Sequence, residues 1–247
     1  MLPQRQHLLV IGAPRSGTTL LATMIGRHTD VGMLNEDVTG GWIDKVLGKP
    51  WSGTKLCVPN QIQLQPKRFF AKRLFKNLGL VREAPRSARG ILEYLAVPEL
   101  KIVAIIRDGN DAVASMMKRG GNRFAKAARR WGTAVQTIYT LSARYPDRVL
   151  VVSYEQLVLS PETVMRAVCA FLQLPLQAGM LDGHKFNPYY PQDEIDRSLA
   201  YRQKRAQVDL HLEDVLPDAV RQYDALMAAQ GDSDSDDAPA VAHPPPA

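Results

Sequence analysis

Arginine and hydroxyl side chains stand between two glycines near the start of the chain, in the segment GAPRSGTT from Gly12 to Thr19. The glycines have the spacing of the phosphate-binding loop G-x-x-x-x-G-K-[ST], in which backbone N–H groups face a phosphate at the start of a helix. Thr18 replaces the lysine of that loop, which reaches the β and γ phosphates of a nucleoside triphosphate. The segment therefore predicts a site for a ligand with one terminal anionic group, and Arg15 is its charged contact.

Two alternatives stay open for this loop. An ordinary glycine-rich turn from a strand into a helix has the same glycines. A kinase or nucleotidase that uses ATP and magnesium would need the positive charge that Thr18 does not carry. Residues elsewhere in the chain that could contact an anion therefore decide between these interpretations.

The residues around the loop predict the elements that hold it. His7–Ile11 is an apolar strand, and Thr18–Arg27 carries apolar residues at helical spacing, so the loop joins a strand to a helix. The same order recurs where the β-branched strand Lys101–Ile106 is followed by a helix over Asp111–Arg119. Strands that alternate with helices predict an α/β fold, in which helices flank a central parallel sheet.

Further elements follow the same alternation. The periodic residues predict one long helix over Gly120–Arg144, with five residues toward the core: Phe124, Trp131, Val135, Ile138 and Leu141. A strand that ends at Val152, a short helical turn to Leu159, a helix that starts at Pro161 and a C-terminal helix over Leu216–Ala229 complete the predicted elements. The basic segment from Gln65 to Arg89 predicts an amphipathic helix with a solvated basic face, and the alternative is a basic lip for an acidic substrate. We expect one domain over residues 1–230 and a disordered tail rich in Asp, Pro and Ala over residues 231–247.

The composition limits the classes of function. The chain has 247 residues, 45% of them hydrophobic, and a formal net charge of +6, so it can bury one sizeable core and favours anionic ligands. The sequence contains no dense basic run with interleaved aromatic residues, so nucleic acid is not an expected partner. The apolar stretches are too short for a membrane span, and the two cysteines, Cys57 and Cys169, lie in apolar contexts. These features predict a cytoplasmic protein without a disulfide framework.

The loop resembles the phosphosulfate-binding loop of the P-loop sulfotransferases, and two further segments described below resemble other motifs of that family. These enzymes use 3′-phosphoadenosine 5′-phosphosulfate (PAPS) as donor and release adenosine 3′,5′-bisphosphate (PAP). The match to the family's 5′-phosphosulfate loop covers Pro14–Thr19. The resemblance implies donor contacts from Arg15, Ser16, Gly17, Thr18 and Thr19. It also implies a P-loop NTPase-like α/β fold and sulfuryl transfer to an acceptor hydroxyl, with no metal.

The two further segments supply the other donor contacts that the resemblance implies. In IIRDGNDAVAS, Arg107 at the end of a strand is followed eight residues later by Ser115, the spacing at which the family binds the 3′-phosphate. The segment SYEQL is similar to the family's Y-E-x-L, whose tyrosine lines the nucleotide pocket, and this implies the same place for Tyr154. A late segment of the family closes over the nucleotide, which makes Ser198 and Arg202 further candidates for the 3′-phosphate.

Within the family, residues 8–175 most resemble the tyrosylprotein sulfotransferases and their bacterial relatives. The catalytic glutamate of that branch corresponds to Glu36, and its catalytic lysine corresponds to Lys55 in SGTKLCVP. Val38 stands where that branch has an arginine.

The resemblance implies an in-line displacement at sulfur. Glu36 would take the proton of the acceptor hydroxyl, and Lys55 and Arg15 would stabilise the charge that develops on the sulfuryl and bridging oxygens. Asp37 and His28 are alternatives for the base.

The sequence alone is compatible with several acceptors and with more than one oligomeric state. Carbohydrate, lipid, small-molecule and peptide hydroxyls all fit the donor chemistry. Trp42 and Trp51 either line an acceptor pocket or belong to the core. A homodimer is compatible with the sequence, and a non-catalytic nucleotide-binding protein of the same fold is the remaining alternative.

Overall fold

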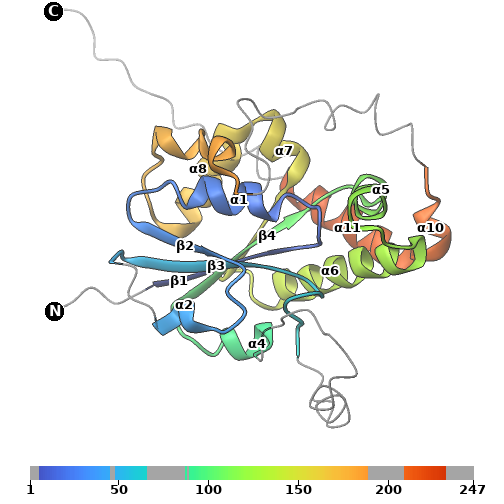
Figure 1. Ribbon diagram of the computed structural model, residues 1–247, viewed down its shortest axis with the longest axis horizontal. Coiled ribbons are helices and arrows are strands. Elements are labelled where there is room, and N and C mark those ends of the chain that lie inside the picture. Colours follow the sequence, from blue (N-terminus) through green and yellow to red (C-terminus); the bar gives the residue numbers. More distant parts are fainter. Residues whose placement is uncertain (1–5, 45–47, 66–86, 88, 189–208, 232–247) are drawn as a thin grey trace, which may run out of the picture.

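A single parallel sheet forms the centre of the protein (Figure 1). The computed structural model describes residues 6–44, 48–65, 87, 89–188 and 209–231. The five strands lie in the order β2-β3-β1-β4-β5, and each neighbouring pair is parallel. In chain order they are β1 (Gln6–Gly12), β2 (Val31–Asn35), β3 (Trp51–Cys57), β4 (Leu100–Ile106) and β5 (Val149–Ser153). The predicted α/β fold with a central parallel sheet is therefore confirmed.

Helices cover both faces of this sheet, as Figure 1 shows. One layer consists of α1 (Thr18–Ile25), α7 (Tyr154–Leu159), α8 (Pro161–Leu172) and the 3₁₀ turns η1 (Ala178–Met180) and η2 (Gly183–Phe186). The opposite layer consists of α2 (Gly41–Asp44), α4 (Ile91–Tyr94), α5 (Gly109–Gly120), α6 (Phe124–Arg144), α10 (Leu212–Val215) and α11 (Pro217–Gly231). Along β1, Leu8 and Val10 pack into the first layer while Leu9 and Ile11 pack into the second. A central strand buried on both faces in this way has a continuous apolar sequence.

The structure corrects the prediction of one long helix over Gly120–Arg144. α5 ends at Gly120, and Gly121 has φ 58°, a left-handed conformation that ends a helix and that glycine adopts without steric cost. A new helix, α6, begins at Phe124. The strand β2 had no counterpart among the predicted elements.

Several other predicted segments can be compared with the structure. Of the core residues predicted for the long helix, Trp131, Val135, Ile138 and Leu141 are buried in α6, whereas Phe124 at its start is partly buried. Almost all of the predicted basic helix between Gln65 and Arg89, and the predicted tail beyond residue 231, lie outside the described residues. Within the described part of the chain, the helices are too short or too polar to cross a bilayer.

The strand order places one crevice at the carboxyl end of β1. From β1 the chain passes through α1 to β2 on one side, and it later returns through α4 to β4 on the other side of β1. In open parallel sheets, ligands bind outside the carboxyl ends of the strands at the point where the strand order reverses in this way. The segment GAPRSGTT leaves β1 at that point.

Candidate functional site

The loop between β1 and α1 has the backbone geometry of an anion cradle. Gly17 caps α1 with φ 89°, and Arg15 has φ 71°, so two residues of this short loop are left-handed. The first N–H groups of α1 have no partner within the helix and carry the positive end of its dipole. The Ser16 hydroxyl is buried and has no hydrogen-bond partner among the described residues. This arrangement fits an anion that the loop and helix would hold together.

Gly17 cannot be replaced without disturbing this cradle. A Cβ at Gly17 would lie 2.5 Å from Cδ2 of Tyr154, and its φ disfavours any L side chain. We therefore expect Gly17→Ala to lower the affinity for PAP by at least about tenfold. Calorimetric titration measures this, with Gly179→Ala as matched control, because an added Cβ at Gly179 meets nothing within 4 Å. Equal PAP affinity in both variants would contradict the assignment of the loop.

The predicted 3′-phosphate pair lies against this loop. Arg107 is 6% exposed, its Nη1 donates a hydrogen bond to the Arg15 carbonyl at 2.9 Å, and its guanidinium stacks 4.3 Å from the centre of the Tyr154 ring. Arg15 in turn donates from Nε to the Ser115 hydroxyl at 3.3 Å. The structure thus brings together Arg15, Arg107, Ser115 and Tyr154, which are far apart in the sequence. The buried Nε of Arg107 has no partner among the described residues, so this guanidinium keeps a donor for an anion.

Two residues that the sequence did not single out hold Arg107 in place. The Trp131 indole N–H donates to the Arg107 carbonyl at 3.1 Å, and the buried Glu155 carboxylate accepts the N–H of Asp108 at 3.0 Å. Glu155 follows Tyr154 in the Y-E-x-L segment, so its position in that motif was the available signal. Trp131 was predicted only as a core residue.

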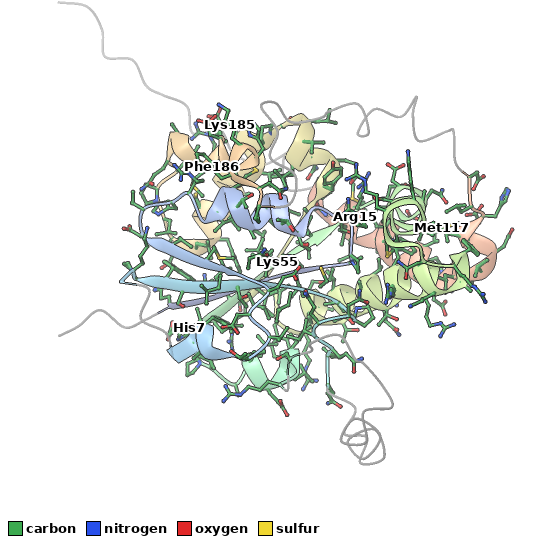
Figure 2. The ribbon with its side chains drawn as sticks, viewed as in Figure 1. His7, Arg15, Lys55, Met117, Lys185 and Phe186 are labelled. Carbon is green, nitrogen blue, oxygen red and sulfur yellow. The ribbon has the colours of Figure 1, made fainter. Side chains whose placement is uncertain are left out.

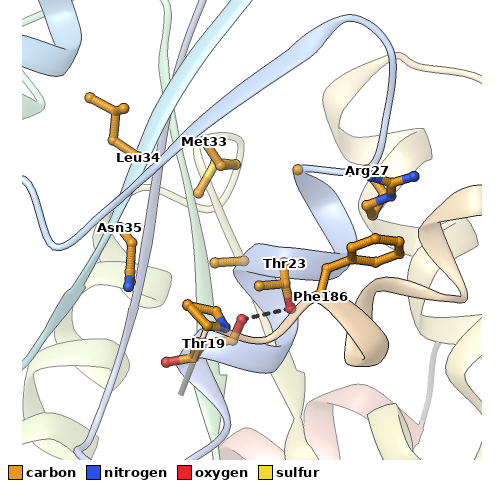
Figure 3. Close-up of a pocket in the computed structure, with 10 residues that line it drawn as sticks. Thr19, Thr23, Arg27, Met33, Leu34, Asn35 and Phe186 are labelled. Atoms are coloured by element: carbon orange, nitrogen blue, oxygen red, sulfur yellow. Dashed lines mark hydrogen bonds between the residues drawn. The ribbon is translucent and has the colours of Figure 1, made fainter. Parts of the chain in front are cut away.

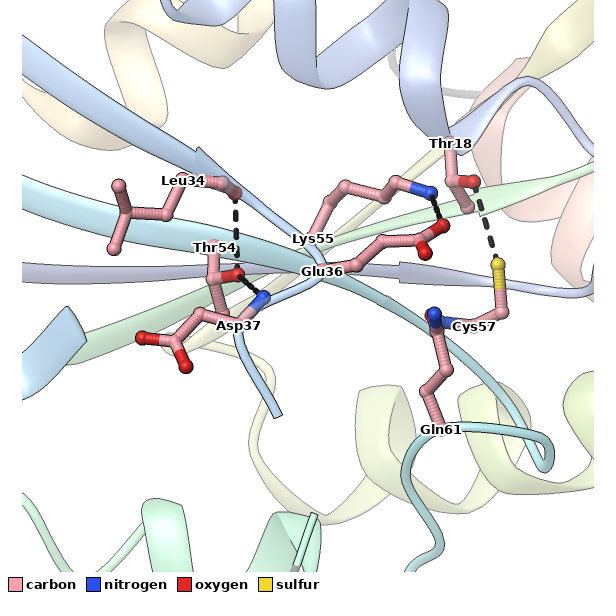
Figure 4. A network of polar contacts seen from close by, with 8 residues as sticks. All are labelled: Thr18, Leu34, Glu36, Asp37, Thr54, Lys55, Cys57 and Gln61. Carbon is pink, nitrogen blue, oxygen red and sulfur yellow. Dashed lines mark hydrogen bonds and ion pairs between the residues drawn. The ribbon is translucent and has the colours of Figure 1, made fainter. Parts of the chain in front are cut away.

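A lysine and a glutamate form the second part of the site (Figure 4). Lys55 is paired in register with Val10 of β1 and Asn35 of β2, and its side chain is 3% exposed. Its Nζ donates to Oε1 of Glu36 at 2.5 Å. Glu36 follows the end of β2 with φ 59°, and this left-handed conformation is uncommon for a residue with a side chain. Strained residues of this kind concentrate at functional sites.

The alternatives for the base differ from Glu36 in their contacts. The Asp37 carboxylate accepts hydrogen bonds from the backbone N–H and the hydroxyl of Thr39, at 2.9 and 2.5 Å. His28 is fully buried, and its Nδ1 accepts the N–H of Asp30 while Nε2 lies 3.0 Å from the Pro175 carbonyl. Both ring nitrogens of His28 thus serve the backbone. Of the three candidates, only Glu36 contacts Lys55 in these hydrogen bonds.

A cysteine thiol lies between the two parts of the site. Sγ of Cys57 is 3.7 Å from Oγ1 of Thr18, and both cysteines of the chain are free, as predicted. Burial raises the pKa of the Cys57 thiol above its ordinary 9.0, while the nearby Lys55 opposes the rise. The thiol therefore stays protonated at neutral pH, and it packs against the loop as a neutral group.

We expect iodoacetamide to alkylate Cys57 slowly at about pH 7 in the native protein and at the rate of a free thiol in urea. Because the pKa is higher in the folded state, the stabilisation by this group is present below about pH 9 and is lost as the pH rises further. Residue-resolved mass spectrometry of both cysteines checks the rates. Fast alkylation of Cys57 in the native protein at about pH 7 would contradict a protonated thiol with limited access.

The remaining predicted residues lie elsewhere or outside the described part of the chain. Trp42 and Trp51 are buried in the core, at 0% and 3% exposure, so they do not line an acceptor pocket. Ser198 and Arg202 lie outside the described residues. Figure 2 shows Arg15 and Lys55 in the central part of the molecule, whereas His7 lies toward the other end of the strands.

The fold and the loop define a class: an α/β protein of the P-loop type with an anion cradle at its central strand. The model of the sulfotransferase family matches residues 60–178. Over this span the chain is similar to the sulfotransferase family.

Curated relatives show the same similarity. Protein-tyrosine sulfotransferase 1 of Danio rerio is 29% identical over 198 residues, which is 70% of this chain and 55% of that protein. Protein-tyrosine sulfotransferase 1 of Homo sapiens is 28% identical over 70% of this chain and 53% of that protein. The chain thus spans about half the length of these relatives.

Solved structures share the fold. The sulfotransferase domain of the Synechococcus PCC 7002 olefin synthase has a TM-score of 0.59 at 18% identity and covers 91% of this chain and 95% of its own. A mouse sulfotransferase complexed with PAP has a TM-score of 0.52 at 14% identity and covers 94% of this chain and 90% of its own. Likeness at these identities concerns the architecture, which is that of sulfotransferases.

Proposed function

We propose that the protein is an enzyme that transfers the sulfuryl group of PAPS to the hydroxyl of an acceptor. The observation that carries the proposal is the convergence of an anion cradle, a buried arginine and a Lys55–Glu36 pair at the carboxyl ends of β1, β3 and β4. Similarity to the sulfotransferase family and to protein-tyrosine sulfotransferases supports the same reaction.

The chain's own residues fit both ends of the donor. The N-terminus of α1, with Ser16, Gly17, Thr18 and Thr19, would hold the 5′-phosphosulfate. The buried hydroxyl of Ser16, without a partner among the described residues, supports this place.

The other end of the donor would meet Arg107 and Ser115, with Tyr154 beside the nucleotide. Arg107 Nε is a buried donor without a partner among the described residues, and a 3′-phosphate would supply one. Ser115 would exchange its bond from Arg15 for a bond to the phosphate. The Arg15 side chain would then turn toward the transferred group.

In the proposed reaction, Glu36 takes the proton from the acceptor hydroxyl as that oxygen attacks sulfur. The bond between sulfur and the bridging oxygen breaks on the far side, and PAP leaves. Lys55 positions Glu36 through the 2.5 Å contact, and its charge stabilises the oxygens that become more negative. Arg15 and the loop N–H groups stabilise the sulfuryl oxygens in the same way, and we propose that no metal takes part.

Calorimetric titration of the protein with PAP, AMP and ATP tests the donor site, with EDTA or with magnesium. We expect PAP to bind equally well in EDTA and more tightly than AMP, because only PAP has a 3′-phosphate. Radiolabelled PAPS then reports transfer to candidate acceptors. A preference for ATP with magnesium would favour a kinase, and PAP binding without any transfer would favour a non-catalytic protein of the same fold.

A further inference from the structure

A hollow lies between α1 and β2 on the layer that carries the loop (Figure 3). Its volume is about 190 Å³, and it is open to solvent on one side. Thr19 and Thr23 of α1 form one wall, Met33 and Asn35 of β2 form the other, and the half-exposed Phe186 at the end of η2 lies at the far rim. The donor contacts described above involve only one of these residues, Thr19.

One end of this pocket adjoins the proposed transfer site. Asn35 is the register partner of Lys55, and the next residue in the chain is Glu36. At the opposite wall, Thr19 follows Thr18 at the start of α1. An oxygen at this end of the pocket would therefore lie next to the Lys55–Glu36 pair and the anion cradle.

The size and chemistry of the pocket favour a compact apolar occupant. A cavity of about 150 Å³ lined by apolar side chains can hold benzene, so this pocket has room for one ring or a short alkyl chain. Of the ten residues that line it, only Arg27 is ionisable, and its guanidinium stacks 4.0 Å over the Phe186 ring at the rim. The Thr23 hydroxyl already donates to the carbonyls of Thr19 and Leu20. A sugar ring would lose water from its hydroxyls here without gaining enough partners.

The far rim is held in place by close backbone packing. A Cβ at Gly183 would lie 2.4 Å from Cα of Met24, so η2 rests directly on α1 with no room for a side chain between them. This contact fixes where Phe186 lies relative to α1. The position of this rim relative to α1 is therefore set by the fold.

We propose that this pocket holds the body of the acceptor, and that the acceptor is a small apolar alcohol, aryl or alkyl, whose hydroxyl reaches Glu36. The inference rests on the proposed sulfuryl transfer and adds the class of acceptor to it. Asn35 and Thr19 flank the hydroxyl end, Met33 and Thr23 contact the apolar body, and Phe186 with Arg27 forms the rim.

Replacement of Thr23 by phenylalanine tests the pocket without touching the donor contacts. We expect Thr23→Phe to raise the KM for para-nitrophenol and for hexanol at least about tenfold, because the added ring occupies the space of the acceptor. Met33→Ala should instead improve turnover of a two-ring alcohol such as naphthol. The matched control is Thr140→Phe, since Thr140 is exposed on α6 and its hydroxyl donates to the Gln136 carbonyl in the same way.

The readouts separate this inference from the function on which it rests. PAP affinity, measured by calorimetry, should be the same in Thr23→Phe as in the unaltered protein, which also shows that the variant folds. Transfer to glucose or to a tyrosine peptide in preference to the small alcohols, or a KM that Thr23→Phe leaves unchanged, would overturn the inference while sulfuryl transfer stands. Absence of PAP binding and of transfer in the unaltered protein would overturn the proposed function itself.

Discussion

The Glu36→Gln variant is expected to transfer the sulfuryl group roughly 10²- to 10⁴-fold more slowly than the unaltered protein, because an amide cannot take the acceptor proton. Glutamine keeps the size of the side chain and can still accept the hydrogen bond from Lys55. The loss should therefore appear in kcat under saturating donor and acceptor. PAP affinity should hold or rise, because a negative charge beside the donor site is removed. Radiolabelled transfer and calorimetry measure the two quantities.

Asp37→Asn is the matched control for this prediction. Asp37 is the neighbouring carboxylate, but its oxygen accepts hydrogen bonds from Thr39. We expect its turnover to stay within about threefold of the unaltered protein, because the hydrogen bonds of its carboxylate to Thr39 stabilise a local turn. A large loss in Asp37→Asn together with full activity in Glu36→Gln would transfer the role of base to Asp37.

Replacement of Arg107 by methionine is expected to weaken PAP binding about a hundredfold. A hydrogen bond to a charged group contributes about 1.5–3 kcal/mol, and a hundredfold change in affinity corresponds to about 2.7 kcal/mol. AMP lacks the 3′-phosphate, so its affinity should change little. Calorimetric titration of both nucleotides gives the ratio of their affinities, which isolates the 3′-phosphate from general effects on the loop.

The control for Arg107→Met is the same change at an exposed arginine. Arg166 pairs with Glu162 along α8, and both side chains are more than half exposed. Arg166→Met should leave both affinities unchanged. If PAP and AMP weakened equally in Arg107→Met, the arginine would act only through the Arg15 carbonyl and would not contact the 3′-phosphate.

The parts of the fold that the sequence predicted well are those determined by local pattern. β1, β4 and β5 are apolar and rich in β-branched residues, so their composition alone distinguishes them. β2 is a short edge strand, VGMLN, that is largely half-buried and contains a glycine, which leaves little signal. The break between α5 and α6 depends on the left-handed Gly121, and the helical periodicity on both sides concealed it.

In the candidate site, too, the sequence predicts the residues of one local segment better than contacts between distant segments. The loop residues are contiguous, so their types and spacing alone predict an anion cradle. The contact of Lys55 with Glu36 depends on the register of β2 against β3, which one sequence does not specify. The proposed acceptor pocket joins α1 to residues near Phe186 that are far apart in the sequence, whereas the two tryptophans proposed from sequence lie in the core.

Arg15, Lys55, Arg107 and Tyr154 lie at the carboxyl ends of four different strands of one sheet, and this has a consequence for thermal stability. No fragment of the sheet contains the complete proposed donor site, so we expect PAP to bind the native state and not the unfolded chain. At about one hundred times its dissociation constant, such a ligand adds about 2.7 kcal/mol to the free energy of unfolding. For a chain of this length, that corresponds to a rise in melting temperature of roughly 5–10 °C. A thermal-shift screen of nucleotides would therefore rank donor analogues without knowledge of the acceptor.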